Sequence, residues 1–241
     1  MSPLAAMLLA FSLQGAPPAT PAYGLRLSAP LVAPASFFVG ALDAPVELQV
    51  QAATGDAQAE ADRRYAAAVR LRADLGTIHR ALGITTWVVM AVALAAGMIQ
   101  YYNLYGFGAG RDTNPCATGQ AVFGQDQCWG TPWLHAISAG VTTALYGVTM
   151  SMSFGLLAND PNDVLGGRGS YSDRIRAHSV LALIHLAGMV AQIVMGVGVA
   201  NGWFGDRTND YGTLQAVATA HQVIGFVTWG ALGAAAALML F

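Results

Sequence analysis

The stretch Asp74–Trp87, DLGTIHRALGITTW, marks the point where an arginine-rich segment ends and an apolar segment begins. His79 stands at this boundary, and after Arg80 no charged residue occurs before Arg111. The arrangement occurs three more times, because apolar segments also begin at His135, His178 and His221. Two questions follow: what the apolar segments form, and why each of them begins with an imidazole.

The composition of the chain is typical of a membrane protein. Of its 241 residues, 55% are hydrophobic and 10% are charged, and none is lysine, whereas soluble domains carry about a quarter charged residues. A bilayer is crossed by about 20 apolar residues in a helix. Four uncharged segments are long enough to do so: Ala81–Tyr102, His135–Ala158, His178–Trp203 and Ala216–Phe241. No basic cluster with interleaved aromatic residues occurs, so we expect no nucleic-acid partner.

Short connections between these segments predict an all-α fold, an integral membrane four-helix up-down bundle embedded in the lipid bilayer. Residues 1–22 have an apolar stretch followed by small residues and prolines, which is typical of a secretory signal peptide, although no positive charge precedes the stretch. Residues 23–76 are predicted to form a mostly extended tail and then an amphipathic surface helix, rich in Ala, Arg and Glu, that runs into the first span. Residues 77–241 are predicted to form the four-helix transmembrane domain.

The four histidines that open the spans suit a cofactor. Because successive spans alternate in direction, we expect His79 and His178 near one membrane surface and His135 and His221 near the other. Histidine is the commonest metal ligand, and bundles hold cofactors between facing helices. Zinc and non-haem iron normally need three or four ligands, whereas haem iron is satisfied by two imidazoles. The sequence therefore predicts two b-type haems (iron protoporphyrin IX), one in each pair of histidines. The alternative is that the histidines are interfacial residues whose rings bond to water or to carbonyl groups.

A small residue follows each of these histidines one turn later on the same helix face. A flat macrocycle would lie against that face, so we assign these positions to cofactor binding: Gly83, Ala139, Ala182 and Gly225. The fifth histidine, His185, lies on the face of His178 and about 10 Å deeper by helix rise. It could replace His178 as a ligand, hydrogen-bond a haem propionate or bridge helices. His178 is the preferred ligand because its depth in the span matches that of His79.

The pattern of histidines resembles the cytochrome b561 family and related bacterial membrane cytochromes. The resemblance covers about Thr77–Phe241 and rests on the segments IHRALGITTW, LHAISAGVTTALYG, AHSVLALIHLAGM and AHQVIGFVTWG. It implies a four-helix core with two b-type haems, one bound by His79 and His178 and the other by His135 and His221. Eukaryotic members have six spans where this chain has four, and no ascorbate or ferric-ion site is recognisable.

From these observations we expect a membrane-embedded dihaem cytochrome that transfers electrons across or within the bacterial inner (cytoplasmic) membrane. It would be an electron-transfer protein or an oxidoreductase subunit, with no catalytic residues of its own. The electron donor and acceptor are unidentified; the candidates are a quinol, an ascorbate-like reductant and another cytochrome. The chain could form a homodimer or be a subunit of a complex. The alternative is a non-catalytic membrane anchor or assembly subunit of a larger complex, with interfacial histidines and no haem.

Two cysteines, Cys116 and Cys128, lie in the connection between the first and second spans and would form a disulfide in an oxidising compartment.

Two signals in the sequence contradict each other on the orientation in the membrane. Arginines are concentrated on the side of His79, and the positive-inside bias would make that side cytoplasmic. A cleaved signal peptide would instead place the tail, and with it the same side, outside the cytoplasm.

Overall fold

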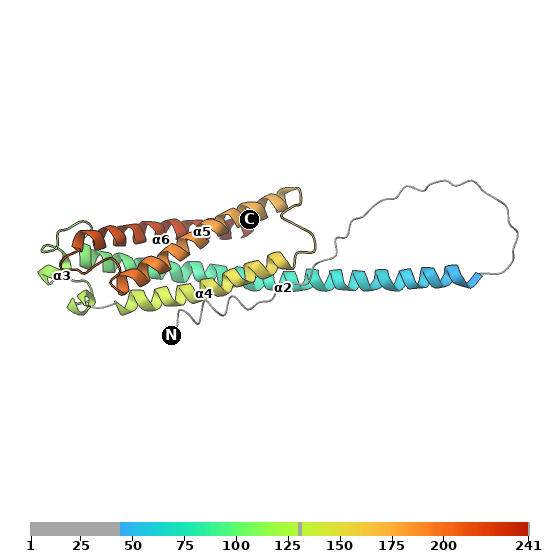
Figure 1. The fold of residues 1–241 in the computed structure, drawn as a ribbon, viewed down its shortest axis with the longest axis horizontal. Coiled ribbons are helices and arrows are strands. Elements are labelled where there is room, and N and C mark those ends of the chain that lie inside the picture. Colours follow the sequence, from blue (N-terminus) through green and yellow to red (C-terminus); the bar gives the residue numbers. More distant parts are fainter. Residues whose placement is uncertain (1–43, 130–131, 241) are drawn as a thin grey trace. The chain divides into compact units, whose positions relative to one another are not determined.

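The computed structural model of the chain describes residues 44–129 and 132–240, and the compact unit considered below starts at Gln49. The predicted signal peptide and residues 23–43 of the predicted tail lie outside the described residues. Within the described residues the structure is all-helical and contains no strand. Its elements are α2 (Ala44–Tyr105), α3 (Pro115–Thr118), η1 (Gln125–Cys128), α4 (Trp133–Ala158), α5 (Ser170–Ala200) and α6 (Tyr211–Leu240), shown in Figure 1.

Helix α2 is longer than the sequence predicts, because it begins at Ala44 and continues without a break to Tyr105. After Pro45 the segment contains no proline and only four glycines, and it is rich in strong helix formers. Residues 55–78 are exposed on almost all sides, so this part of α2 continues the axis of the first span rather than lying along a surface (Figure 1). Its polar contacts reach the end of α4 and the α4–α5 connection. Tyr65 contacts Asn162, and Arg72 contacts Asp160 and the Leu156 carbonyl.

Four of the helices, α2, α4, α5 and α6, are long and apolar enough to cross a membrane. Their most apolar windows are poorly covered by the rest of the chain; in α5 only 11% of the window is buried. Large apolar side chains are correspondingly exposed in the middle of each helix: Val88, Val92, Val141, Val148, Leu183, Val190, Val223 and Val227. An exposed apolar surface of this extent is characteristic of an interaction surface for lipid or protein.

The interior of the helix bundle follows one heptad register counted from the histidine of each helix. One heptad after the histidines lies a layer of buried polar side chains, namely Thr86, Thr142, His185 and Thr228. The next inward positions are Met90, Tyr146, Met189 and Leu232, which form most of the buried apolar core. Two heptads after the histidines lie Ala93, Thr149, Gln192 and Ala235. Residues with this spacing share a helix face. Each helix therefore contributes one residue to each of four layers, namely the histidines and the three sets that follow them.

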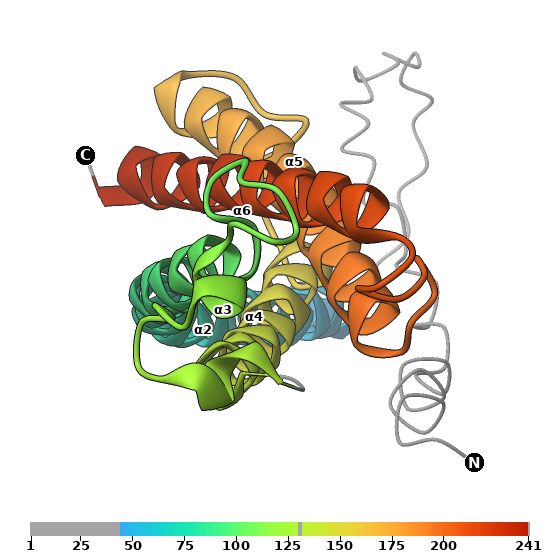
Figure 2. The ribbon, with the colours of Figure 1, turned by 90° about the vertical axis from the view of Figure 1, so that its left-hand side faces the viewer.

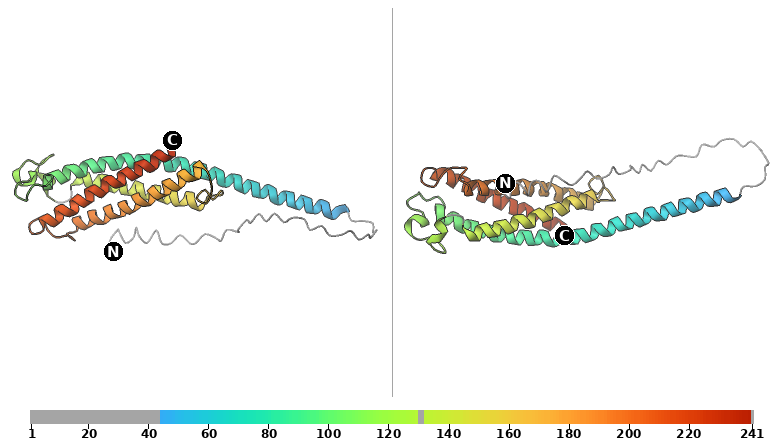
Figure 3. Two further views of the ribbon diagram at one scale, coloured as in Figure 1. Left: turned by 90° about the horizontal axis from the view of Figure 1, so that it is seen from above. Right: turned by 60° about the horizontal axis from the view of Figure 1, so that its bottom comes forward.

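Contacts between helices close this interior from several sides. The indole rings of Trp87 on α2 and Trp229 on α6 are stacked, with centroids 5.0 Å apart and planes 8° apart. On the α4–α5 side the Tyr146 hydroxyl and His185 Nδ1 are 2.8 Å apart. In Figure 2 and Figure 3 the four long helices lie side by side, and α2 joins them after its exposed part.

The connections at the C-terminal end of α2 are tied to one another. Cys116 and Cys128 are joined by a disulfide, the pairing that the sequence allows. Two arginines link this α2–α4 connection to the α5–α6 connection: Arg111 donates to the Thr208 carbonyl at 2.9 Å, and Arg207 donates to the Cys128 carbonyl. The two connections therefore form one structure over this end of the bundle.

Candidate functional site

The first pair of histidines comes from α2 and α5. The ring centroids of His79 and His178 are 6.2 Å apart, and the ring planes are 79° apart. His79 Nδ1 is 3.2 Å from the Thr149 carbonyl, and His178 Nδ1 is 3.0 Å from the Ala235 carbonyl. Because a carbonyl only accepts, each of these bonds needs a proton on Nδ1. The nitrogen that remains with a lone pair in each neutral ring is Nε2.

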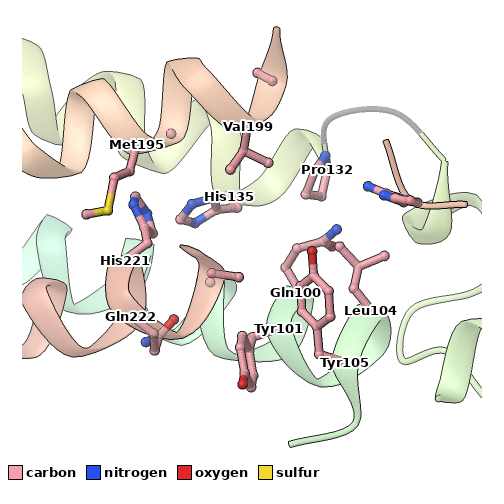
Figure 4. Close-up of a pocket in the computed structure, with 15 residues that line it drawn as sticks. Gln100, Tyr101, Leu104, Tyr105, Pro132, His135, Met195, Val199, His221 and Gln222 are labelled. Carbon is pink, nitrogen blue, oxygen red and sulfur yellow. The ribbon is translucent and has the colours of Figure 1, made fainter. Parts of the chain in front are cut away.

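The second pair comes from α4 and α6. The ring centroids of His135 and His221 are 6.1 Å apart, with planes 82° apart, and Figure 4 shows the two rings next to each other. His135 Nδ1 is 3.1 Å from the Ala93 carbonyl. His221 Nδ1 is buried without a partner among the described residues, while Gln192 Nε2 donates to the His221 carbonyl at 2.6 Å. Three of the four imidazoles are thus oriented by a backbone carbonyl. Helix α6, which carries the fourth imidazole, is instead held through the main-chain carbonyl of His221.

The spacing within each pair has the size that a shared metal ion requires. A metal–imidazole bond is about 2 Å long, so two imidazoles on opposite sides of one ion have ring centres about 6 Å apart. A second-shell carbonyl on Nδ1 is also usual for metal-binding histidines, because it fixes the tautomer and the ring orientation. Among the described residues, no three His, Cys, Asp or Glu side chains come together. Each site therefore offers two imidazoles, the donor set of a bis-histidine haem.

A cavity of about 480 Å³ adjoins the second pair. Its wall includes Gly97 on α2 and Gly196 on α5, and both glycines face histidine rings. A Cβ on Gly97 would lie 3.1 Å from His135 Cε1, and one on Gly196 would lie 3.6 Å from His221 Cε1. The close approach at Gly97 is tighter than ordinary van der Waals contact, so a side chain at this position would require the His135 ring to shift by a few tenths of an ångström.

The small residues predicted to flank a macrocycle lie in different surroundings. A Cβ on Gly83 would meet only Thr149 Cγ2, at 3.9 Å, so space is open beside this glycine. A Cβ on Gly225 would lie 2.9 Å from Leu94 Cδ2, so Gly225 allows close helix packing instead. Ala139 and Ala182 are half-buried. The role of these four positions toward a cofactor stays a prediction.

Sequence reasoning missed other small residues that lie beside the histidine rings. Gly97, Ser153 and Gly196 each lie four residues beyond the two-heptad position of their own helix. Gly97 and Gly196 face rings of the second pair, and Ser153 Oγ is 3.5 Å from His79 Nδ1. These small residues could have been found in the sequence, but only by aligning each histidine with the opposite end of the neighbouring helix.

His185 is not part of either pair. His178 faces His79, while His185 is only 4% exposed and lies 2.8 Å from the Tyr146 hydroxyl through Nδ1. Of the three roles that the sequence allowed, the geometry corresponds to a bridge between helices α4 and α5. Because both side chains are deeply buried, each satisfies the polar group of the other.

The arrangement as a whole offers two separate bis-imidazole sites at the two ends of one helical interior. Along α2 the first site lies at His79 and the second at Ala93, two heptads or about 21 Å further by helix rise. Comparisons of the chain with protein-family models, with curated proteins and with solved structures find no match. The functional assignment therefore depends on the geometry of these residues.

Proposed function

We propose that the chain is a membrane-embedded dihaem b-type cytochrome that transfers electrons across the bacterial inner membrane. The observation that supports this most directly is the pairing of four histidines from four helices, with ring centroids 6.2 Å and 6.1 Å apart. Two unrelated interfacial histidines would have no reason to face each other at the spacing of a shared ion. Here the spacing occurs twice, and three of the four imidazoles are oriented by backbone carbonyls.

The apolar surface of the bundle supports insertion in a bilayer as an up-down four-helix bundle. Four helices have the length and hydropathy of spans, and their exposed side chains are largely Val, Leu and Phe. Water would not stabilise such a surface, whereas lipid would. In this arrangement each histidine pair lies toward one membrane surface, as expected for an electron path that crosses the bilayer.

The residues of the chain contribute position and electrostatics. When bound, haem supplies a one-electron couple between ferrous and ferric iron. The two histidines of each pair would hold the iron, and the carbonyl acceptors of Thr149, Ala93 and Ala235 keep the rings of His79, His135 and His178 in place. At the second pair the cavity lining is mainly apolar and would screen the charge of a bound haem weakly, so burial and these hydrogen bonds would tune its midpoint potential. The donor and acceptor would be a quinol, an ascorbate-like reductant or another cytochrome.

Two independent features support one orientation. Arginines cluster at the end of the bundle that carries the first pair: Arg63, Arg64, Arg70, Arg72, Arg80, Arg168, Arg174 and Arg176. The positive-inside rule makes that end cytoplasmic. The Cys116–Cys128 disulfide lies at the other end, near the second pair, and disulfides persist in oxidising compartments. Both features support an orientation in which the second pair lies toward the outside of the inner membrane.

The test is the visible absorption spectrum and haem content of the full chain, purified from bacterial membranes in detergent. A dihaem b-type cytochrome gives a sharp α-band on reduction and two haems per chain. We expect His79→Ala and His135→Ala each to reduce the content to one haem, because each removes one ligand of one pair. The matched control is His185→Gln, which alters a buried histidine outside both pairs and should keep two haems.

A colourless protein would overturn the proposal and favour the membrane anchor with interfacial histidines. Loss of haem in His185→Gln with retention in His79→Ala would also overturn it, because the ligand set would then differ from the two pairs. Correct folding of each variant is checked by its elution as a monodisperse species and by its helical circular dichroism.

A further inference from the structure

The cavity beside the second pair changes character along its length. At its inner end lie the rings of His135 and His221, with apolar neighbours such as Met195 and Val199 (Figure 4). Among the described residues that line it, Arg207 is the only one with a formal charge. Arg207 lies in the α5–α6 connection and is itself exposed, so it stands at the outer end of the cavity. An apolar space with imidazoles inside and a cation at its mouth suits a flat apolar molecule with an anionic edge.

The guanidinium of Arg207 is held in place but is not neutralised. One of its NH groups, Nη1, donates to the carbonyl of Cys128, a residue fixed by the disulfide to Cys116. Within the described ranges, the ion pairs of the structure involve other arginines. A guanidinium has five N–H donors, so several remain for a ligand, and its planar fork matches a carboxylate.

The neighbouring Asp206 does not compensate this charge, because its carboxylate caps its own turn. It accepts hydrogen bonds from the main-chain NH of Thr208 at 2.8 Å and of Asn209 at 3.0 Å, and from Asn209 Nδ2 at 2.9 Å. These bonds hold the pKa of Asp206 below its usual value, led by the side-chain bond from Asn209. The carboxylate is therefore ionised at neutral pH while it faces its own loop.

We propose that Arg207 is the cationic anchor for the propionate carboxylates of the haem held between His135 and His221. The inference rests on the proposed function and adds a residue to one of its two sites. Haem carries its two carboxylates on one edge of an apolar macrocycle, the same distribution that the cavity has between Arg207 and the histidines. A second polar group is available, since Gln222 lines the cavity and its Nε2 is buried without a partner among the described residues.

The test compares Arg207→Gln with Arg111→Gln in the full chain. Arg111 is a matched control, because it also ties the two connections together through a backbone carbonyl, but it does not line the cavity. We expect Arg207→Gln to lower the midpoint potential of one haem, since a cation near the iron favours the reduced form. We also expect that haem to be lost about tenfold more readily to a haem acceptor. Arg111→Gln should leave both values unchanged, and Arg207→Lys should restore the potential in part.

A second measurement separates the charge interaction from a loss of structure. Apoprotein is reconstituted either with haem or with haem dimethyl ester, in which both carboxylates are blocked. With haem, the wild type should retain the second-site group about tenfold better than Arg207→Gln. With the ester, wild type and variant should be equal. An effect of Arg207→Gln that persists with the ester would overturn the anchor, as would unchanged haem retention and potentials in that variant. A wild type that binds no haem at all would instead reject the proposed function.

Discussion

The imidazole of His79 and the carbonyl of Thr149, 3.2 Å apart, form one half of a reciprocal contact between α2 and α4. The other half joins His135 Nδ1 to the carbonyl of Ala93 at 3.1 Å. Each acceptor lies two heptads after the histidine of its own helix. The two helices are therefore matched in register: the histidine of each helix contacts the residue that lies two heptads after the histidine of the other.

Helices α5 and α6 repeat this relationship with one alteration. His178 Nδ1 meets the carbonyl of Ala235, which again lies two heptads after His221. The counterpart position on α5 is Gln192, whose side chain donates to the His221 carbonyl instead. The bundle thus consists of two similar helix pairs, and each helix pair gives one imidazole to each site. Because the levels are set by helix rise, the separation of the two sites along the bundle is fixed at about 21 Å.

The first prediction concerns the close approach of α2 to His135. Gly97→Val would place side-chain atoms where a Cβ alone already lies 3.1 Å from His135 Cε1. Overpacking of this kind costs about 1–3 kcal/mol or is relieved by displacement of the ring. We expect the variant to bind one haem in place of two, with the His79–His178 site retained. Haem content and the reduced α-band measure this.

The control for that change is Gly147→Val on α4, since a Cβ on Gly147 would meet nothing within 4 Å. It introduces the same side chain into a span without approaching a histidine. Equal haem content in the two variants would show that the Gly97 contact does not position His135.

The parts of this fold that the sequence predicted are those that depend on a local pattern. Four helices follow from four uncharged apolar segments, and the pairing of His79 with His178 and of His135 with His221 follows from alternating direction along the chain. Both inferences need only the order of residues. The preference for His178 over His185 as a ligand came from the depth of each residue in its span and stays a prediction; the ring of His178 does lie beside that of His79.

The parts that were not predicted depend on contacts between distant segments. Gly97 faces His135 only because α2 and α4 are offset by two heptads, and no local window of sequence contains that offset. Arg207 was unremarkable in the sequence, and it becomes notable only when two connections meet over one cavity. The start of α2 at Ala44 was missed because residues 23–50 are rich in Pro, Ala and Val, a composition that suggested an extended tail.

The second prediction concerns the buried pair of Tyr146 and His185. Tyr146→Phe removes the hydroxyl and leaves His185 Nδ1 buried without its partner, which costs about 1–3 kcal/mol. Removing both polar groups in Tyr146→Phe/His185→Leu should recover much of that loss. The free energy of unfolding in mixed detergent micelles measures this, with the exposed Tyr171→Phe as control. Two haems should remain in Tyr146→Phe, and a loss of haem would assign His185 a role at the cofactor.

The third prediction concerns the ion pair that ties α2 to the α4–α5 connection. Arg72 and Asp160 are 2.7 Å apart, and their side chains are 20% and 6% exposed. Asp160→Asn leaves a largely buried guanidinium without its counter-ion, so we expect a loss of about 3 kcal/mol, at the low end for buried pairs because Arg72 is partly exposed. Glu60→Gln, which breaks exposed pairs with Arg63 and Arg64, should cost much less, because water screens exposed ion pairs. Equal losses in the two variants would contradict the structural role of Asp160.

The fourth prediction concerns the side of the membrane that carries the disulfide. In Cys128→Ser the remaining Cys116 is half-buried and free to react. If the arginine-rich end is cytoplasmic, a membrane-impermeant maleimide should label this thiol in intact spheroplasts. The comparison is Arg168→Cys in a chain that lacks both native cysteines, because residue 168 is exposed in the α4–α5 connection. That thiol should react only after the membrane is permeabilised. Labelling of the Arg168→Cys protein in intact spheroplasts, with protection of Cys116, would show the opposite orientation and place the His79–His178 site toward the outside.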